Sequence, residues 1–422
     1  MTWYGKTTSR QMEALLESRP SLAQLLAAPE FLQEIKTYNP KLLDYISNTP
    51  TLISEGIRYL TQAPTPQDSA DRKHKLPLQT IELVETETTC ILNGFFKEGD
   101  GGVLNLDLLF GLLEGEEVLP LLAGYFFRTN LCLLNNRYKE TVERVYSRPG
   151  VFDRLIAHSE HMAVSNTIQL FLNLDTSKNP SSDDKLTLRK EVLRKIIRKI
   201  QQESQRGHPA SPAIVENLSG VLIETIDKYH LIVDGKQMIE AASDAEAVAV
   251  MMGLLRTPNE HAFAAMAYFI ALINYYSFSS HNTEEHNPEA ARKATERLEA
   301  QPMINELIGY FPVAMGRVMG CQKIDLYHYR LLEVFCHCIS IASMRIFRAI
   351  CDCGFFASLV ELLFRHSANN VLHMLIEKSF YHVFISERKI YEEYKRHLFC
   401  EVDIIKATVS RILGLFSEQR FF

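Results

Sequence analysis

Apolar residues recur along this chain at every third or fourth position, and runs that alternate apolar with polar residues are hard to find. This spacing places the apolar residues on one face of an α-helix, whereas strict alternation would indicate a strand. Short helices of this kind are stable only when their apolar faces pack against other helices. The pattern therefore predicts an all-α protein built from many short helices.

The predicted helices cover most of the chain and are separated by short turns, several of which contain proline. In the first half they span Ser9–Ser18, Pro40–Ser47, Leu52–Thr61, Leu78–Phe96, Leu104–Leu113, Val118–Leu134, Glu140–Tyr146 and Val151–Leu172. In the second half they span Leu186–Glu203, Ala213–Tyr229, Asp244–Leu255, Glu260–Tyr276, Glu289–Glu299, Leu326–Ile341, Met344–Ile350, Phe355–Arg365, Asn369–Val383 and Val402–Phe416.

Short helices at nearly regular spacing, each apolar along one face, share a continuous core when they stack in pairs. We therefore expect an armadillo- or HEAT-like α-solenoid of stacked helix pairs, as a single domain over residues 1–422. The similarity between successive units is weak, so the solenoid should be irregular. Polar stretches rich in turn-forming residues predict loops within it at residues 63–73, 175–184 and 279–287.

The most informative segment is Cys353–His373, with the sequence CGFFASLVELLFRHSANNVLH. Two apolar helical patterns flank Asn369 and Asn370, and asparagine favours helix caps and turns. The segment therefore predicts a helix–turn–helix unit, with Phe364 and Leu372 in its core. It resembles the motif of the SAPS family, whose members are regulatory subunits that bind the Sit-type (phosphatase six class) serine/threonine protein phosphatase.

Further segments resemble the same family and follow its order along the chain. They are Met1–Leu26, Phe31–Tyr45, Pro120–Phe127, His158–Leu172, Leu188–Leu193, Asn217–Leu222 and, more faintly, Tyr394–Leu413. None of these segments is catalytic or diagnostic alone, so the resemblance lies in their shared order.

The resemblance implies a non-catalytic regulatory and scaffold subunit that binds the phosphatase catalytic subunit and directs it to substrates. Further adaptor proteins are a second class of partner that it allows. It also supplies candidate contact residues, since Asn369, Asn370 and His373 match the Asn-Asn-x-Leu-His block of the family. For the two asparagines, helix capping is the alternative role. Divalent metals would belong to the catalytic partner, so no cofactor is expected here.

A cluster of cations stands out in a chain whose formal net charge is −6. That negative charge argues against nucleic acid as a partner. Between Lys185 and Ile200, however, Glu191 is the only acidic residue among several cations, including Arg189. We expect a local positive field here and a docking patch for an acidic partner segment, formed by Arg194, Lys195, Arg198 and Lys199. A solvated helix face and a membrane-surface contact are the alternatives.

Tests for catalytic and metal-binding motifs leave no candidate catalytic, cofactor or metal residue. Cys336 and Cys338 are separated by one residue, which places them on different sides of a helix rather than in the spacing of a zinc site. His158 and His161 lack the H-E-x-x-H order of a zinc protease. Two rivals remain: a solenoid adaptor without a phosphatase partner, and an enzyme such as a metal-dependent hydrolase that uses these histidines.

The apolar stretches and the cysteines indicate where in the cell the protein resides. The longest apolar stretch, Ala262–Phe278, is interrupted at Asn274 and is shorter than the roughly 20 residues that a spanning helix needs, so no membrane span is expected. Eight cysteines occur in spacings that suggest no disulfide framework, and no signal peptide is recognised. We expect a reducing compartment, the cytoplasm, with the nucleus as a second location.

Overall fold

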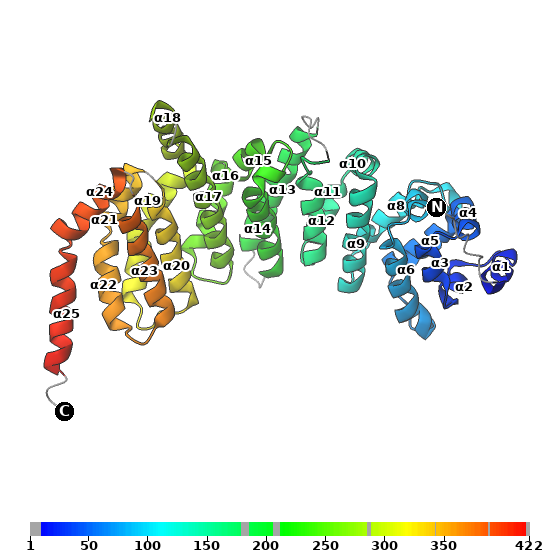
Figure 1. Ribbon diagram of the computed structural model, residues 1–422, viewed down its shortest axis with the longest axis horizontal. Coiled ribbons are helices and arrows are strands. Elements are labelled where there is room, and N and C mark those ends of the chain that lie inside the picture. Colours follow the sequence, from blue (N-terminus) through cyan, green and yellow to red (C-terminus); the bar gives the residue numbers. More distant parts are fainter. Residues whose placement is uncertain are drawn as a thin grey trace, which may run out of the picture. The chain divides into compact units, whose positions relative to one another are not determined.

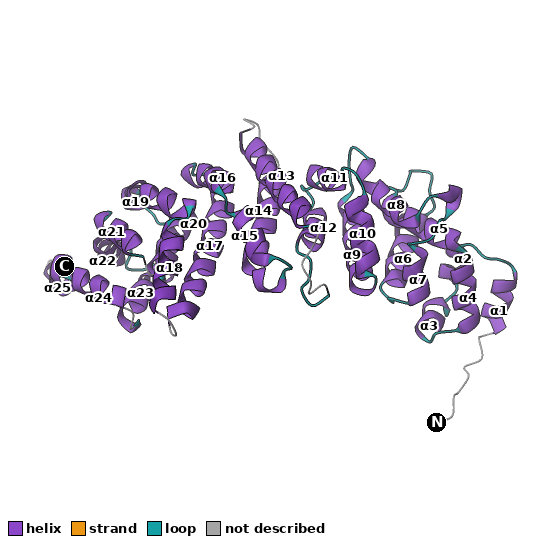
Figure 2. Ribbon diagram, turned by 90° about the horizontal axis from the view of Figure 1, so that it is seen from above, coloured by secondary structure: helices purple, strands orange, loops and turns teal. Residues whose placement is uncertain are grey.

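The computed structural model describes residues 10–178, 185–205, 212–284, 288–341, 343–386 and 389–418. These residues form helices joined by short loops, and their β structure is limited to isolated bridges such as the one between Glu98 and Leu104 (Figure 2). The prediction of an irregular all-α solenoid is confirmed. The chain divides into two compact units, Met1–Lys195 and Ile196–Phe422, each described here by itself.

Unit 1 contains helices that follow one another along a stack in chain order (Figure 1). Their bounds are α1 Arg10–Glu17, α2 Leu22–Ala27, α3 Phe31–Lys36, α4 Pro40–Asn48, α5 Pro50–Thr61, α6 Leu76–Val84, α7 Thr89–Gly94, α8 Asn105–Phe110, α9 Pro120–Asn136, α10 Tyr138–Ser147, α11 Val151–Ala157 and α12 Met162–Leu172. Short helical turns lie between them at η1 Asp71–Lys75, η2 Asp100–Gly102 and η3 Gly111–Glu114. Helix α13, Leu186–Gln205, begins in this unit.

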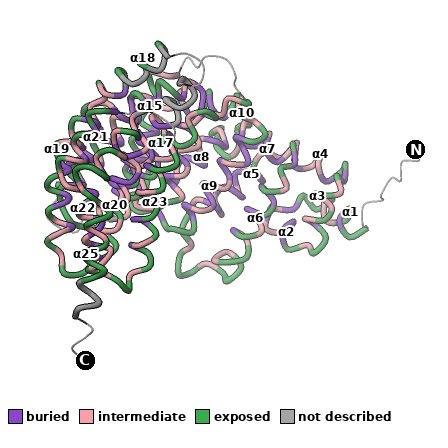
Figure 3. The backbone as a smooth tube through the Cα atoms, turned by 60° about the vertical axis from the view of Figure 1, so that its left-hand side comes forward, coloured by how far each residue is buried: buried purple, intermediate pink, exposed green. Residues whose placement is uncertain are grey.

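The core of unit 1 runs without interruption from one helix to the next. The ring of Phe110 in α8 lies 5.1 Å from that of Phe126 in α9 and 6.3 Å from that of Phe171 in α12. All three side chains are buried, and Figure 3 shows buried positions along α5, α8 and α9. Aromatic rings at these separations stabilise the packing beyond the area that they bury.

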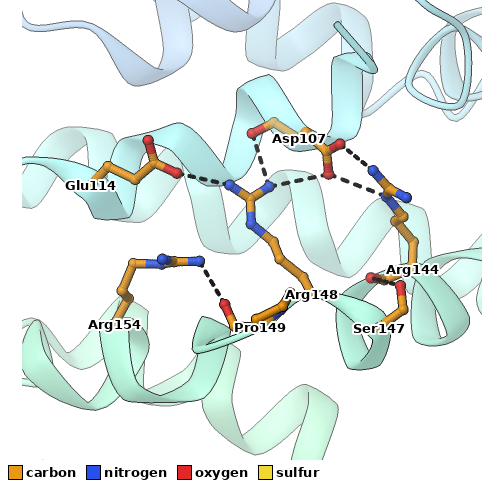
Figure 4. A network of polar contacts seen from close by, with 7 residues as sticks. All are labelled: Asp107, Glu114, Arg144, Ser147, Arg148, Pro149 and Arg154. Carbon is orange, nitrogen blue, oxygen red and sulfur yellow. Dashed lines mark hydrogen bonds and ion pairs between the residues drawn. The ribbon is translucent and has the colours of Figure 1, made fainter.

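A polar network fastens α8 to the end of α10 above this core (Figure 4). Arg148 donates from Nη1 to the backbone oxygen of Asp107 at 3.1 Å and from Nη2 to Glu114 Oε1 at 3.0 Å. Arg144 pairs with the same Asp107 carboxylate. The guanidinium of Arg148 also lies 5.7 Å from the centre of the Phe110 ring. These contacts give the cations of this region a structural role.

Unit 2 continues from the second half of α13 with longer helices (Figure 1). Their bounds are α14 Pro212–Asp227, α15 Gly235–Ala242, α16 Ala245–Arg256, α17 His261–Glu284, α18 Pro288–Glu299, α19 Pro302–Gly320, α20 Leu326–Ile339, α21 Met344–Asp352, α22 Phe355–Arg365, α23 Asn370–Ile385, α24 Lys389–Arg396 and α25 Ile404–Glu418. Two helical turns, η4 Tyr229–Leu231 and η5 His397–Glu401, complete the unit.

The core of unit 2 is also continuous. Helix α17 packs against α14, α16, α18 and α20. Further along, Phe335 of α20 lies 4.6 Å from the ring of Phe311 in α19 and 5.0 Å from that of Phe355 in α22. No helix formed by the described residues combines the length and the apolar character needed to cross a membrane.

Several predicted boundaries differ from the structure. The predicted helix Leu78–Phe96 is two helices, because α6 ends at Val84 and Glu87, in the loop before α7, adopts a left-handed conformation with φ of 53°. The predicted helix Val151–Leu172 is likewise split, at His158–His161. Helices α2, α3, α15, α19 and α24 were not predicted.

The predicted loops also differ in part. Helix α17 continues to Glu284 through most of the loop predicted at 279–287, whose last residues lie outside the described ones. The loop predicted at 63–73 becomes helical at Asp71. Of the loop predicted at 175–184, residues 175–178 form a turn and the others lie outside the described residues. The prediction of a single domain over residues 1–422 stays a prediction.

Candidate partner-binding surfaces

The turn between α22 and α23 holds the predicted block of contact residues. Asn369 precedes α23, and its Oδ1 accepts a hydrogen bond from the backbone N–H of Leu372 at 3.0 Å. Ring Nε2 of His373 lies 3.1 Å from the backbone oxygen of His366, so Nε2–H donates across the turn. Asn370, the first residue of α23, is exposed. Asn369 and His373 therefore shape the turn, while Asn370 points its side chain to solvent.

The packing of this helix pair agrees with the sequence at one position and differs at another. Leu372 is fully buried, as the sequence predicts. Phe364 is only partly buried, so its placement in the core was wrong. The buried residues of α22 lie on the side of Leu359 and Leu362, and Phe364 sits at the edge of that face.

Helix α23 also presents an apolar face that the sequence interpretation missed. Its residues are 58–69 % exposed; they are Val371, Met374, Tyr381 and Ile385. At about 100° per residue these positions, with the exposed Lys378 between them, fall within about 80° of one another around the helix. We call these four apolar residues the α23 exposed face. Apolar residues on both sides of α23 were the signal that could have revealed it.

The cations predicted as a docking patch on α13 all have acidic partners. The ion pairs are Arg194–Glu191 at 3.6 Å, Lys195–Asp153 at 2.7 Å, Arg198–Glu246 at 3.5 Å and Lys199–Glu203 at 2.7 Å. The cation of Arg189 is not on the surface at all, because its side chain is fully buried and its Nε donates to the backbone oxygen of Leu172 at 2.8 Å. The expected positive field is therefore largely compensated, and the docking patch stays a prediction.

The histidines and cysteines tested for chemistry occupy structural positions. His158 ends α11 and His161 precedes α12, and both rings lie beside the carboxylate of Glu160, at 3.7 Å and 3.4 Å. Among the described residues, no three His, Cys, Asp or Glu side chains come together in a way that could hold a metal ion. All eight cysteines are free.

Burial also keeps the best-packed thiols protonated. It raises the pKa of the Cys336 thiol to about 12 and that of Cys132 to about 11. Cys336 makes a contact of 2.7 Å with the hydroxyl of Ser379. Because the thiolate is the reactive form of cysteine, these groups are suited to packing rather than to nucleophilic chemistry.

Comparison with known proteins gives three informative relatives, while no family model matches the chain. The fission yeast Schizosaccharomyces pombe protein "extragenic suppressor of kinetochore protein 1" is 29% identical over 180 residues, which are 41% of this chain and 21% of that protein. Serine/threonine-protein phosphatase 6 regulatory subunit 1 of Mus musculus is 29% identical over 179 residues, 42% of this chain and 20% of that protein. Regulatory subunit 2 of Mus musculus is 28% identical over 223 residues, 50% of this chain and 23% of that protein. The chain thus matches about a fifth of the length of these relatives.

Proposed function

We propose that this chain, a relative of the SAPS-family regulatory subunits of serine/threonine-protein phosphatase 6, is a regulatory subunit of the same kind. The similarity to regulatory subunits 1 and 2 is the observation that carries the proposal. The chain would bind a serine/threonine phosphatase catalytic subunit of that class and bring it to its substrates. Such tethering raises the effective substrate concentration without new chemistry. The metal ions of the reaction would be held by the catalytic subunit.

The solenoid architecture suits this role. Stacked helix pairs form extended surfaces on which another folded protein can lie. A stable complex of this kind buries about 1,200–2,000 Å² of surface, which a few helix pairs supply. A solenoid adaptor without a phosphatase partner would have the same architecture. The similarity to the phosphatase regulatory subunits is what favours the phosphatase partner over that alternative.

The α23 exposed face and the adjoining turn are the surface that we assign to the catalytic subunit. Exposed apolar residues that follow one helix face are typical of a binding surface. Tyrosine and methionine are both enriched at the centres of protein interfaces, and this face contains Tyr381 and Met374. Asn370 lies beside it with an exposed side chain. The family block and the exposed face therefore lie on the same helix.

A binding measurement between the full chain and a purified phosphatase 6 catalytic subunit tests this function. Calorimetry or biolayer interferometry should show a complex, and phosphatase activity should elute with the chain in gel filtration. Tyr381→Glu or Met374→Glu should weaken the complex by about 2 kcal/mol or more, roughly 30-fold, because a charge would be desolvated in the interface.

Leu231→Glu is the matched control, since Leu231 is a similarly exposed apolar residue of unit 2 outside the α23 exposed face. It should bind like the unaltered chain. Failure of the unaltered chain to bind the catalytic subunit would overturn the function. Full binding by both Tyr381→Glu and Met374→Glu would instead remove the α23 exposed face from the interface and leave the function standing.

A further inference from the structure

Unit 2 contains an open cavity of about 570 Å³ between the last turns of α19, the start of α20 and the loop before α17. Phe263 and Tyr327 form two of its walls, and Gly316 and Gly320 of α19 lie along its floor. The volume is within the range of about 300–1,000 Å³ that is usual for binding pockets. This cavity is separate from the α23 exposed face, because the two have no residue in common.

The two glycines keep the floor of the cavity open. They are four residues apart and therefore lie on the same face of α19. A side chain added at either position would have no heavy atom within 4 Å. Glycine weakens a helix interior, but it lets another backbone approach closely. The cavity is therefore open to solvent along the surface of α19 as well as at its mouth.

A cation is fixed in the wall of this cavity. Arg317 donates from Nη1 to the hydroxyls of Tyr310 and Tyr327, at 3.0 Å and 2.9 Å, and from Nη2 to the backbone oxygen of Arg256 at 2.7 Å. Tyr310 in turn donates its hydroxyl proton to the backbone oxygen of Leu255 at 3.1 Å. These bonds use three of the five N–H donors of the guanidinium. They hold the cation in place and leave donors for a further acceptor.

The acceptors of Arg317 are all uncharged groups. Nearby arginines differ, since Arg256 pairs with Glu306 at 2.7 Å and Arg365 pairs with Glu361. Among the described residues, no carboxylate forms an ion pair with Arg317, so its charge is not compensated locally.

The carboxylate of Asp325 also lines the cavity, but it is engaged at the start of α20. It accepts hydrogen bonds from the backbone N–H of His328 at 3.1 Å and from ring Nδ1 of the same residue at 2.7 Å. An incoming anion would therefore meet the fixed cation of Arg317, while the negative charge of Asp325 is directed at its own helix.

A second cavity of about 420 Å³ lies next to the first, and Asn259 lines both. The second cavity follows α16 past Gly253, where an added side chain would again have no heavy atom within 4 Å. We call the two cavities together the groove: α19 and the start of α20 line its first part, and α13 and α16 line its second. The groove is larger than a single side chain requires. Such a shape suits an extended peptide segment.

We propose that this groove binds an extended segment of a partner protein that carries an aspartate or glutamate close to a large apolar residue. The acidic side chain pairs with the guanidinium of Arg317, and the apolar side chain packs between Phe263 and Tyr327. Arginine held in this way binds carboxylates with two parallel N–H···O bonds. The site accounts for the uncompensated cation and for the open glycines together. It is independent of the proposed phosphatase function and does not use the α23 exposed face.

Random dodecapeptides displayed on phage and selected on the immobilised full chain test this proposal. Peptides that survive selection should contain an acidic residue within about two positions of an aromatic or large aliphatic one. Synthetic copies with a fluorescent label are then titrated with the chain and its variants. Arg317→Gln should weaken binding at least 10-fold, and Arg317→Lys should keep part of the affinity because the charge remains.

A pair of glycine variants separates blockage of the groove from damage to the helix. Gly316→Leu places a side chain in the groove and should weaken peptide binding at least 10-fold. Gly309→Leu is the matched control, because Gly309 lies in the same helix, is equally open around its Cα and is not part of the groove. It should bind peptides normally, and both variants should melt at the same temperature as each other, at or slightly above that of the unaltered chain, because leucine favours a helix more than glycine does.

Three results would overturn the proposal. They are a selection without enrichment of any peptide, enriched peptides that lack acidic residues, and enriched peptides that bind Arg317→Gln and Gly316→Leu as tightly as the unaltered chain. None of these results bears on the phosphatase complex, whose binding surface is on α23.

Discussion

At the scale of single residues, Asn369 and Asn370 show how neighbouring identical side chains take different roles. The amide oxygen of Asn369 accepts from a backbone N–H that would otherwise have no partner within the helix. Asn370 lies one position later, inside the first turn of α23, where its side chain is exposed. The first is therefore tied to stability, and the second is available to a partner.

This difference predicts the effect of two alanine substitutions. Asn369→Ala should destabilise unit 2 by about 1 kcal/mol, because the N-cap hydrogen bond is lost. For a unit of this size that corresponds to about 2–4 °C in melting temperature. Asn370→Ala should change the melting temperature by less than about 1 °C while it weakens the phosphatase complex. Equal losses of stability in the two variants would show that both asparagines hold the turn.

Two partly buried histidines make unit 2 sensitive to acid. Burial, followed by the nearby charge of Lys378, lowers the pKa of His337 below its ordinary value of 6.5, and the pKa of His382 is lowered for the same reasons. Ring Nδ1 of His337 lies 2.8 Å from Oδ1 of Asn274. Between these lowered pKa values and about 6.5, the unfolded chain binds more protons than the folded chain. The free energy of unfolding therefore increases as pH rises through this range and decreases as pH falls below about 6.5.

We therefore expect the melting temperature to fall between pH 7 and pH 5.5 and to fall less steeply when both histidines are replaced. His337→Gln with His382→Gln removes the two groups that must take up protons on unfolding. Calorimetric melting curves at several pH values measure the slope. A slope that is the same before and after the double substitution would mean that other groups control the acid response.

At the scale of helices, the sequence predicted most of the longer helices but not their interruptions. The break between α6 and α7 covers residues 85–88, where neither glycine nor proline marks it. Helices α2 and α3 are six residues each and depend on packing against their neighbours, which a local pattern does not contain. Helix α19 was missed for the opposite reason, since Pro312 lies inside it and normally ends a helix.

The position of Pro312 predicts that α19 is less stable than it could be. Proline lacks the N–H that would donate to the backbone oxygen of Ile308, so Pro312→Ala should stabilise unit 2 by about 1–3 kcal/mol. Pro302→Ala is the matched control, because Pro302 is the first residue of the same helix, where no such bond is lost. It should change stability by less than about 0.5 kcal/mol. Thermal unfolding compares the two, and a loss of stability in Pro312→Ala would mean that the helix requires the local distortion.

At the scale of the whole molecule, the fold class could be predicted because the spacing of apolar residues is a local property. The binding surfaces could not be predicted in the same way. Val371 and Leu372 are both apolar and adjacent, yet one is 59 % exposed and the other is fully buried. Asp153 pairs with Lys195 from 42 positions away, so the neutralisation of the predicted α13 patch depends on tertiary structure.

The α23 exposed face and the α13 cations are alternative binding surfaces, and they predict opposite salt dependences for the phosphatase complex. If the α23 exposed face carries the binding, apolar burial dominates, and raising the salt concentration from 50 to 500 mM should weaken the complex by less than about threefold. Binding should also show a negative heat-capacity change. Reversing the charges of Lys195, Arg198 and Lys199 should leave the affinity nearly unchanged, because these cations already have acidic partners.

The cost to stability should be small at Lys195 and Arg198, since their exposed pairs contribute about 0–1 kcal/mol each. It should be larger at Lys199, because reversal there places a negative charge beside the buried carboxylate of Glu203. Calorimetric titration of the catalytic subunit at several salt concentrations and temperatures measures both quantities. A steep salt dependence that disappears in the triple reversal would restore the α13 cations as the docking patch. In that case an acidic segment of the partner must displace Asp153 and Glu246 from their ion pairs, and Asp153→Asn and Glu246→Gln should then strengthen the complex.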